Sequence, residues 1–234
     1  MKDDEIKNIP TMKELELNAK SFERSKFPQS ARALTIYSLK LQYLSNSINL
    51  CKETEDYYSL CVLFRSSLEH YFRHLYIFSR ALGENSDEVG AEYYGKLKGH
   101  EDLCFLRSSF SLNTKLNGEK STFSLKGEGN DNLDDVAKNF KINNILSYLN
   151  KGIGEDKEIQ TISKDFFNKY SRDYSTLSSF VHGGPYAEKY MEMYSKDNDG
   201  KQKDIKYLAS ESDLLTNKAR RNTSLFIEIT TNKD

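Results

Sequence analysis

The sequence has no tryptophan, only three prolines and three cysteines, and no excess of charge of either sign. Its prolines stand at positions 10, 28 and 185, so nearly everything in between the last two can be helical without a proline break. The cysteines are odd in number and no CxxC joins them, which argues against a disulfide framework and fits a reducing compartment. The formal net charge of -1 excludes a basic field over the whole surface, although a local basic patch stays open.

Long apolar runs are missing as well. No stretch approaches the ~18 apolar residues of a membrane span, so we expect no membrane partner. The first ten residues, MKDDEIKNIP, are acidic and polar, which predicts no signal peptide and a cytoplasmic protein. A chain of 234 residues can bury a substantial core. We expect an N-terminal arm over residues 1–28 and a single helical domain over residues 29–234.

Residues 56–83 have the strongest helical pattern in the chain. Apolar side chains recur there every three or four residues, which is the period of one helical face. No glycine or proline interrupts the pattern, Asp56 is a suitable N-cap, and Gly83 follows the last apolar position. The positions concerned are Phe64, Leu68, Tyr71, Leu75, Phe78 and Leu82.

The remaining segments favour helices too, and strand-like alternation is poor throughout. The short connection before Asp56 predicts an antiparallel hairpin of two long central helices. The sequence therefore predicts an all-α bundle of about five to seven helices, with a Gly/Asn-rich excursion at about 111–135 and a polar loop at 195–204. The further helices are expected at about 29–54, 101–110, 136–150, 156–182 and 205–230.

Ionisable side chains are embedded in the apolar helix of residues 56–83. Arg65 and Glu69 are four residues apart, which predicts an ion pair on one side of the helix. Arg65 and His70 are five residues apart, about 140° around a helix, and could flank a shared phosphate. The alternatives for these side chains are a solvated face or a buried polar network.

A second group of polar residues lies in the segment SSFVHGG, at the end of the helix expected over 156–182. Ser178 and His182 are one turn apart, and the two glycines let another backbone or a ligand come close. The alternative is that His182 only caps the helix. A serine hydrolase is disfavoured because GxSxG is missing. HExxH and paired cysteines are missing too, so we expect no metal and no cofactor.

The order of two short motifs resembles uncharacterised bacterial families of the HEPN-like group. One helix carries R-x-x-L-E, at Arg65 to Glu69, and a later helix carries Y-x-x-L-S-x-x-V-H-G, at Tyr174 to Gly183. The resemblance implies a helical domain from toxin–antitoxin and antiviral defence systems. Many such domains are metal-independent ribonucleases with an Arg-x4–6-His motif in a composite site across a homodimer, and others are scaffolds.

The resemblance implies catalytic roles for three residues. Arg65 would hold the scissile phosphate, and His70 or His182 would exchange the proton. Glu69, Tyr174 and Ser178 would support them. We therefore expect Arg65, Glu69 and His182 to converge in an RNA-cleaving site; the alternative is a non-catalytic scaffold that binds a partner protein or a second copy.

Overall fold

The computed structural model describes residues 22–117, 131–151 and 157–231. That part of the chain holds nine α-helices, a 3₁₀ turn η1 (Phe22–Arg24), a π-helical segment η2 (Glu92–Leu97) and no strand, which confirms the predicted all-α bundle. The helices are α3 (Pro28–Glu53), α4 (Tyr57–Gly83), α5 (Glu88–Ala91), α6 (Lys98–Asn117), α7 (Asp131–Asn139), α8 (Ile142–Lys151), α9 (Lys157–Val181), α10 (Pro185–Lys196) and α11 (Asn198–Thr230).

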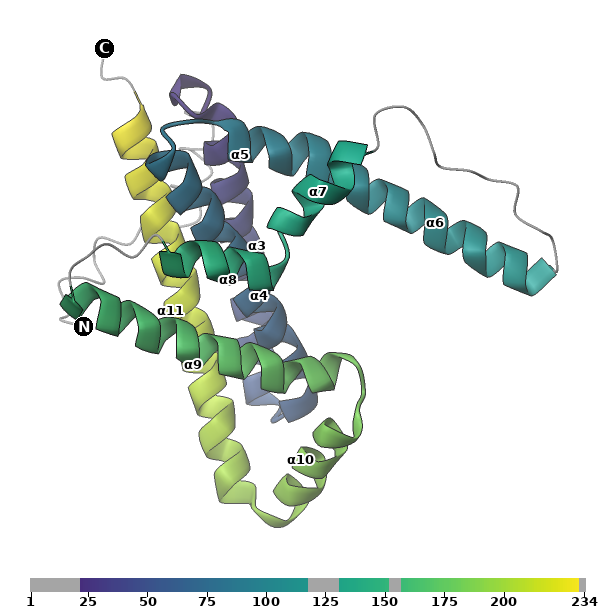
Figure 1. Cartoon of the computed structure of the whole chain (residues 1–234). Coiled ribbons are helices and arrows are strands. Elements are labelled where there is room, and N and C mark those ends of the chain that lie inside the picture. The colour runs from purple at the N-terminus through teal and green to yellow at the C-terminus, as the bar shows by residue number, and fades with distance from the viewer. Residues whose placement is uncertain (1–21, 118–130, 152–156, 232–234) are drawn as a thin grey trace.

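Three long helices, α3, α4 and α11, make the core of the bundle and lie side by side (Figure 1). Asp56 caps α4 by accepting the backbone N–H of Ser59 at 3.1 Å, so α3 and α4 form the expected hairpin. Buried side chains such as Phe64 and Leu68 fill the seam. A buried polar chain also joins the three helices, in which Thr223 of α11 meets Ser38 of α3 at 2.8 Å and His74 of α4 at 2.9 Å.

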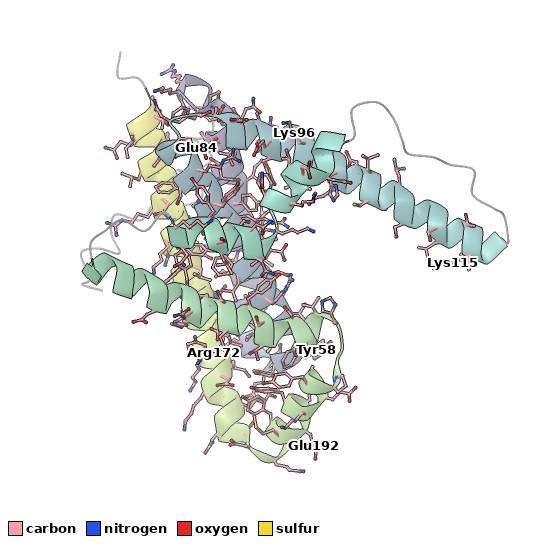
Figure 2. All side chains as sticks on the ribbon, in the orientation of Figure 1. Tyr58, Glu84, Lys96, Lys115, Arg172 and Glu192 are labelled. Atoms are coloured by element: carbon pink, nitrogen blue, oxygen red, sulfur yellow. The ribbon has the colours of Figure 1, made fainter. Side chains whose placement is uncertain are left out.

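Helices α8 and α9 cross α4 on another side (Figure 1). The level at which α9 meets α4 is set by aromatic packing near the C-terminal end of α9. Tyr58 donates its hydroxyl to the carbonyl of Phe180 at 2.6 Å, and the ring of Tyr57 meets the Phe180 ring edge-on at 5.8 Å. Figure 2 shows Tyr58 at this end of α9. None of the described helices combines the length and the apolarity that a bilayer span requires.

Helix α6 leaves the bundle. It packs on η2 and α7 near its start, and its far end, marked by Lys115 in Figure 2, projects away from the other helices (Figures 1 and 2). Residues 111–117 continue this helix and residues 131–135 belong to α7, within the range in which the sequence predicts an excursion. Residues 118–130, and residues 1–21 of the predicted arm, lie outside the described residues.

Two local expectations are wrong. The segment 136–150 is not one helix, because α7 ends at Asn139 and α8 begins at Ile142. The side-chain amide of Asn144 donates to the Lys138 carbonyl at 2.7 Å and so satisfies a carbonyl at the end of α7. The predicted loop 195–204 is mostly helical, since α10 runs to Lys196 and α11 starts directly after Asp197.

Candidate functional site: an arginine–glutamate row on α4 closed by a tyrosine of α9

Arg65, Glu69 and Arg73 lie in one row on α4, each one turn from the next. The guanidinium of Arg65 is paired with one carboxylate oxygen of Glu69, and Nη2 of Arg73 lies 2.9 Å from the other. The ion pair predicted between Arg65 and Glu69 is therefore confirmed. The three side chains are only 18%, 21% and 23% exposed. One largely buried carboxylate is thus shared by two arginines.

Tyr174 of α9 covers the first arginine of the row. Nη2 of Arg65 donates to the Tyr174 hydroxyl at 2.6 Å, and the guanidinium carbon lies 4.4 Å from the centre of the Tyr174 ring. This combines a hydrogen bond with a cation–π contact across two helices. Burial raises the pKa of Tyr174, so the phenol stays neutral and can accept.

The other predicted site residues lie elsewhere. Nδ1 of His70 is 2.8 Å from the Ser66 carbonyl, and its ring meets Tyr37 of α3 edge-on at 5.7 Å. Burial lowers the pKa of His70, which favours a neutral ring. The hydroxyl of Ser178 donates to the Tyr174 carbonyl of its own helix at 2.8 Å, so it is bound to backbone rather than directed at Arg65.

His182 does not join the row. It is exposed just past the end of α9, and its backbone N–H reaches the Ser178 carbonyl at 3.3 Å. It follows Tyr174 by eight residues, about 12 Å of helix. Tyr58 of α4 contacts Phe180, so the end of α9 that carries His182 lies beside the start of α4. Arg65 is about two helical turns farther along α4. The predicted convergence of Arg65, Glu69 and His182 is thus found only for Arg65 and Glu69, and Tyr174 supplies the contact from α9.

Arg73 is the member of the row to which the sequence reasoning gave no role. Its spacing from Glu69 repeats the spacing of Arg65 from Glu69, so the pattern Arg-x3-Glu-x3-Arg was a usable signal. The row also reaches a cavity through this residue, because Arg73 lines a space of about 520 Å³ between α4, α6 and α7.

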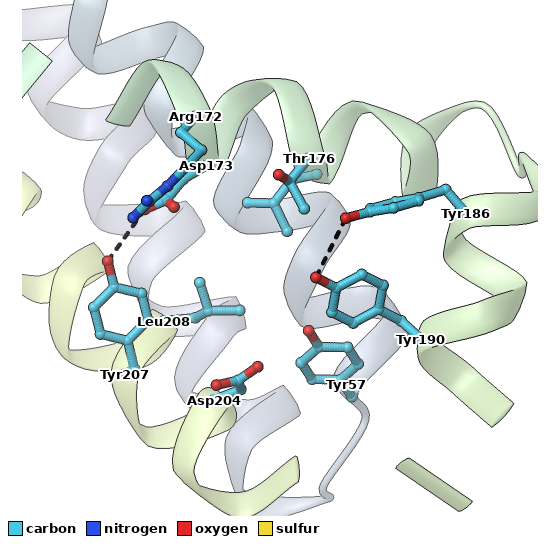
Figure 3. Close-up of a pocket in the computed structure, with 10 residues that line it drawn as sticks. Tyr57, Arg172, Asp173, Thr176, Tyr186, Tyr190, Asp204, Tyr207 and Leu208 are labelled. Atoms are coloured by element: carbon cyan, nitrogen blue, oxygen red, sulfur yellow. Dashed lines mark hydrogen bonds between the residues drawn. The ribbon is translucent and has the colours of Figure 1, made fainter. Parts of the chain in front are cut away.

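Another cavity, of about 370 Å³, lies between α9, α10, α11 and the start of α4 (Figure 3). Tyrosines and carboxylates dominate its wall: Tyr207 donates to Asp173 at 3.1 Å, and the hydroxyls of Tyr186 and Tyr190 are 3.5 Å apart. Burial raises the pKa of Asp173. These polar groups suit a small polar ligand, but the wall contains none of the predicted catalytic residues.

Groups of three or more histidine, cysteine, aspartate or glutamate side chains arranged to hold a metal ion do not occur among the described residues. The α4 row and its contact from α9 comprise two guanidiniums, one carboxylate and one phenol. Comparisons of the chain with models of known families, with curated proteins and with solved structures gave no match.

Proposed function

We propose that the chain is a HEPN-like helical interaction module that pairs with a second copy through α6. The observation that carries this proposal is the apolar surface of that projecting helix. Three large apolar side chains on it are mostly exposed: Phe105 is 71%, Leu112 57% and Leu116 79% exposed. They are spaced by seven and four residues, so they share one face. Exposed apolar side chains that gather on one face mark an interaction site.

The chemistry of α6 favours a second copy in antiparallel orientation as the occupant. A two-fold axis near Ser108 and Ser109 would place Phe105 of one copy opposite Leu112 of the other. The same axis would bring Glu101, near the start of α6, close to Lys115, near its end. Small residues at the centre allow close approach, and the ends attract each other by charge.

The contacts of Arg65 in the α4 row also favour a scaffold. A phosphate-binding arginine presents its terminal nitrogens to the ligand, but Arg65 has Glu69 on one terminal nitrogen and Tyr174 on the other. The role of Arg65 in the module is to hold α9 in contact with α4. A networked polar contact of this kind fixes the relative placement of two helices.

Substitution of Leu112 by lysine is expected to separate the pair. The wild-type chain should have the mass of a dimer in light scattering coupled to gel filtration, and Leu112→Lys the mass of a monomer with unchanged helicity. The matched control is Leu50→Lys, which changes a leucine of α3 that is 63% exposed. A monomeric wild type, or a Leu50→Lys variant that dissociates while Leu112→Lys does not, would refute the α6 interface.

A metal-independent endoribonuclease is the second candidate. It is favoured by the charge of the row, in which two arginines share one carboxylate. In addition, the buried Nε–H groups of Arg65 and Arg73 have no acceptor among the described residues. In this mechanism an RNA phosphate would displace Glu69 from Arg65, and His182 of a second copy would exchange the proton.

RNA cleavage in EDTA separates the two candidates. The interaction module predicts that the wild-type chain cleaves labelled RNA no faster than buffer alone. Cleavage that is lost in both Arg65→Ala and His182→Ala, and kept in the exposed-arginine control Arg221→Ala, would instead support the ribonuclease. Because dimer formation is measured independently, a negative result here leaves the α6 test intact.

A further inference from the structure

Cys104, His100 and Asp134 form a hydrogen-bonded chain at the edge of the 520 Å³ cavity. Sγ of Cys104 lies 3.3 Å from Nε2 of His100, and Nδ1 of the same ring lies 3.0 Å from Oδ1 of Asp134. Cysteine and histidine are one turn apart on α6, while the aspartate comes from α7, which packs against α6. The thiol is exposed and the imidazole is 27% exposed.

The order thiol, imidazole, carboxylate defines what each group can do. The carboxylate accepts the Nδ1–H of His100, which leaves the lone pair of Nε2 for the thiol proton. A nucleophile, a base within reach and a third group that orients the base are the parts of covalent catalysis. A metal site has a different geometry, because its ligands would converge on one point, whereas the two ring nitrogens here face opposite partners.

We propose that Cys104 is a nucleophilic thiol that accepts an acyl group from an anionic ester or acyl phosphate. This activity goes beyond the interaction module and does not depend on it. His100 is the base, and Asp134 is a positioning residue that holds the ring. The cavity supplies the binding wall, with Leu97 and Phe140 for apolar contact. Three cations line the same cavity against two carboxylates: Arg73, Lys138 and Lys141 against Glu101 and Asp134.

The proposed step balances with groups on the chain and in the donor. The proton of the Cys104 thiol moves to Nε2 of His100 as the sulfur attacks the acyl carbon. A carbon–sulfur bond forms, and the bond from the acyl carbon to the leaving oxygen breaks. The leaving group departs with the electron pair and takes the proton from the imidazolium. Water then hydrolyses the thioester and restores the thiol.

The first test uses 4-nitrophenyl acetate and mass spectrometry of the acetylated chain. The acetyl group is expected on Cys104, with no acetyl at that position in Cys104→Ser. Removing the base in His100→Gln should slow acetylation by about 100-fold, the lower end of what general-base catalysis contributes. Asp134→Asn should slow it too, and Asp134→Glu should restore it, which a residue needed only for folding would not do. Acetylation of Cys104 at equal rates in wild type and His100→Gln would overturn the proposal.

A second test addresses the class of donor. Acetyl phosphate carries the anionic leaving group that Lys141 would attract, whereas 4-nitrophenyl acetate is neutral. Lys141→Gln is therefore expected to slow acetylation by acetyl phosphate several-fold more than acetylation by 4-nitrophenyl acetate. Cys51→Ser, which removes a half-buried thiol of α3, is the matched control and should change neither rate. Equal slowing of both donors in Lys141→Gln would refute the anionic donor.

Discussion

Glu69→Ala is expected to lower the free energy of unfolding by about 2–3 kcal/mol. The substitution leaves the guanidiniums of Arg65 and Arg73 together without their shared carboxylate, and both side chains are about four-fifths buried. Breaking a fully buried pair costs about 3–5 kcal/mol, and the remaining exposure of this one reduces the loss. Urea unfolding followed by circular dichroism measures the change.

The matched control is Glu84→Ala on the same helix. Glu84 is also paired with an arginine one turn away, at 3.0 Å from Nε of Arg80, but its side chain is 40% exposed. Arg80 also keeps a second carboxylate partner in Glu92. The loss here is expected to stay below about 1 kcal/mol, as for exposed ion pairs. If both glutamate variants lost the same free energy, the α4 row would have no special structural role.

Acidification from pH 7 to pH 5 is expected to destabilise the chain by about 2 kcal/mol through His74 alone. Burial lowers the pKa of this residue to about 3, whereas an unfolded chain has a histidine pKa near 6.5. Between these values the unfolded state binds a proton that the folded state does not. The stabilisation is therefore complete above pH 6.5 and is lost as the pH falls toward 3.

Carboxylates also titrate on acidification, so the difference between two proteins is the informative quantity. His74→Gln removes the titrating ring, and the unfolding free energy of this variant should fall less between pH 7 and pH 5 than that of the wild type. A His74→Gln variant with the wild-type pH dependence would mean that His74 binds a proton as readily in the folded chain as in the unfolded chain.

Much of the bundle follows from local sequence pattern. The apolar spacing of α4 and the capping residue Asp56 are short-range signals, and both were predicted correctly. The sequence prediction places the start of α11 too late, at about 205, because the residues before it are a run of polar side chains typical of a loop. Asp197 within that run accepts the backbone N–H of Gly200 at 2.9 Å, which is the N-cap arrangement. The polar composition concealed a helix start rather than a loop.

The site was predictable only where its residues share a helix. Arg65 and Glu69 are one turn apart, so their pairing follows from helical geometry. Whether Tyr174 or His182 meets them depends on how far α9 is shifted along α4. The contact between Tyr58 and Phe180 sets that position, and these two residues are more than a hundred positions apart in the sequence. The hydrogen-bonded chain of Cys104, His100 and Asp134 is not predictable for the same reason, because Asp134 reaches His100 from a separate helix.

A double-mutant cycle between Arg65 and Tyr174 tests most directly whether the α4 row fastens α9 to the bundle. The free energies of unfolding of wild type, Arg65→Ala, Tyr174→Leu and the double variant give the coupling between the two side chains. The scaffold account predicts a favourable coupling of about 1–2 kcal/mol, from one charge-assisted hydrogen bond and one cation–π contact. Additive losses, with no coupling, would contradict it.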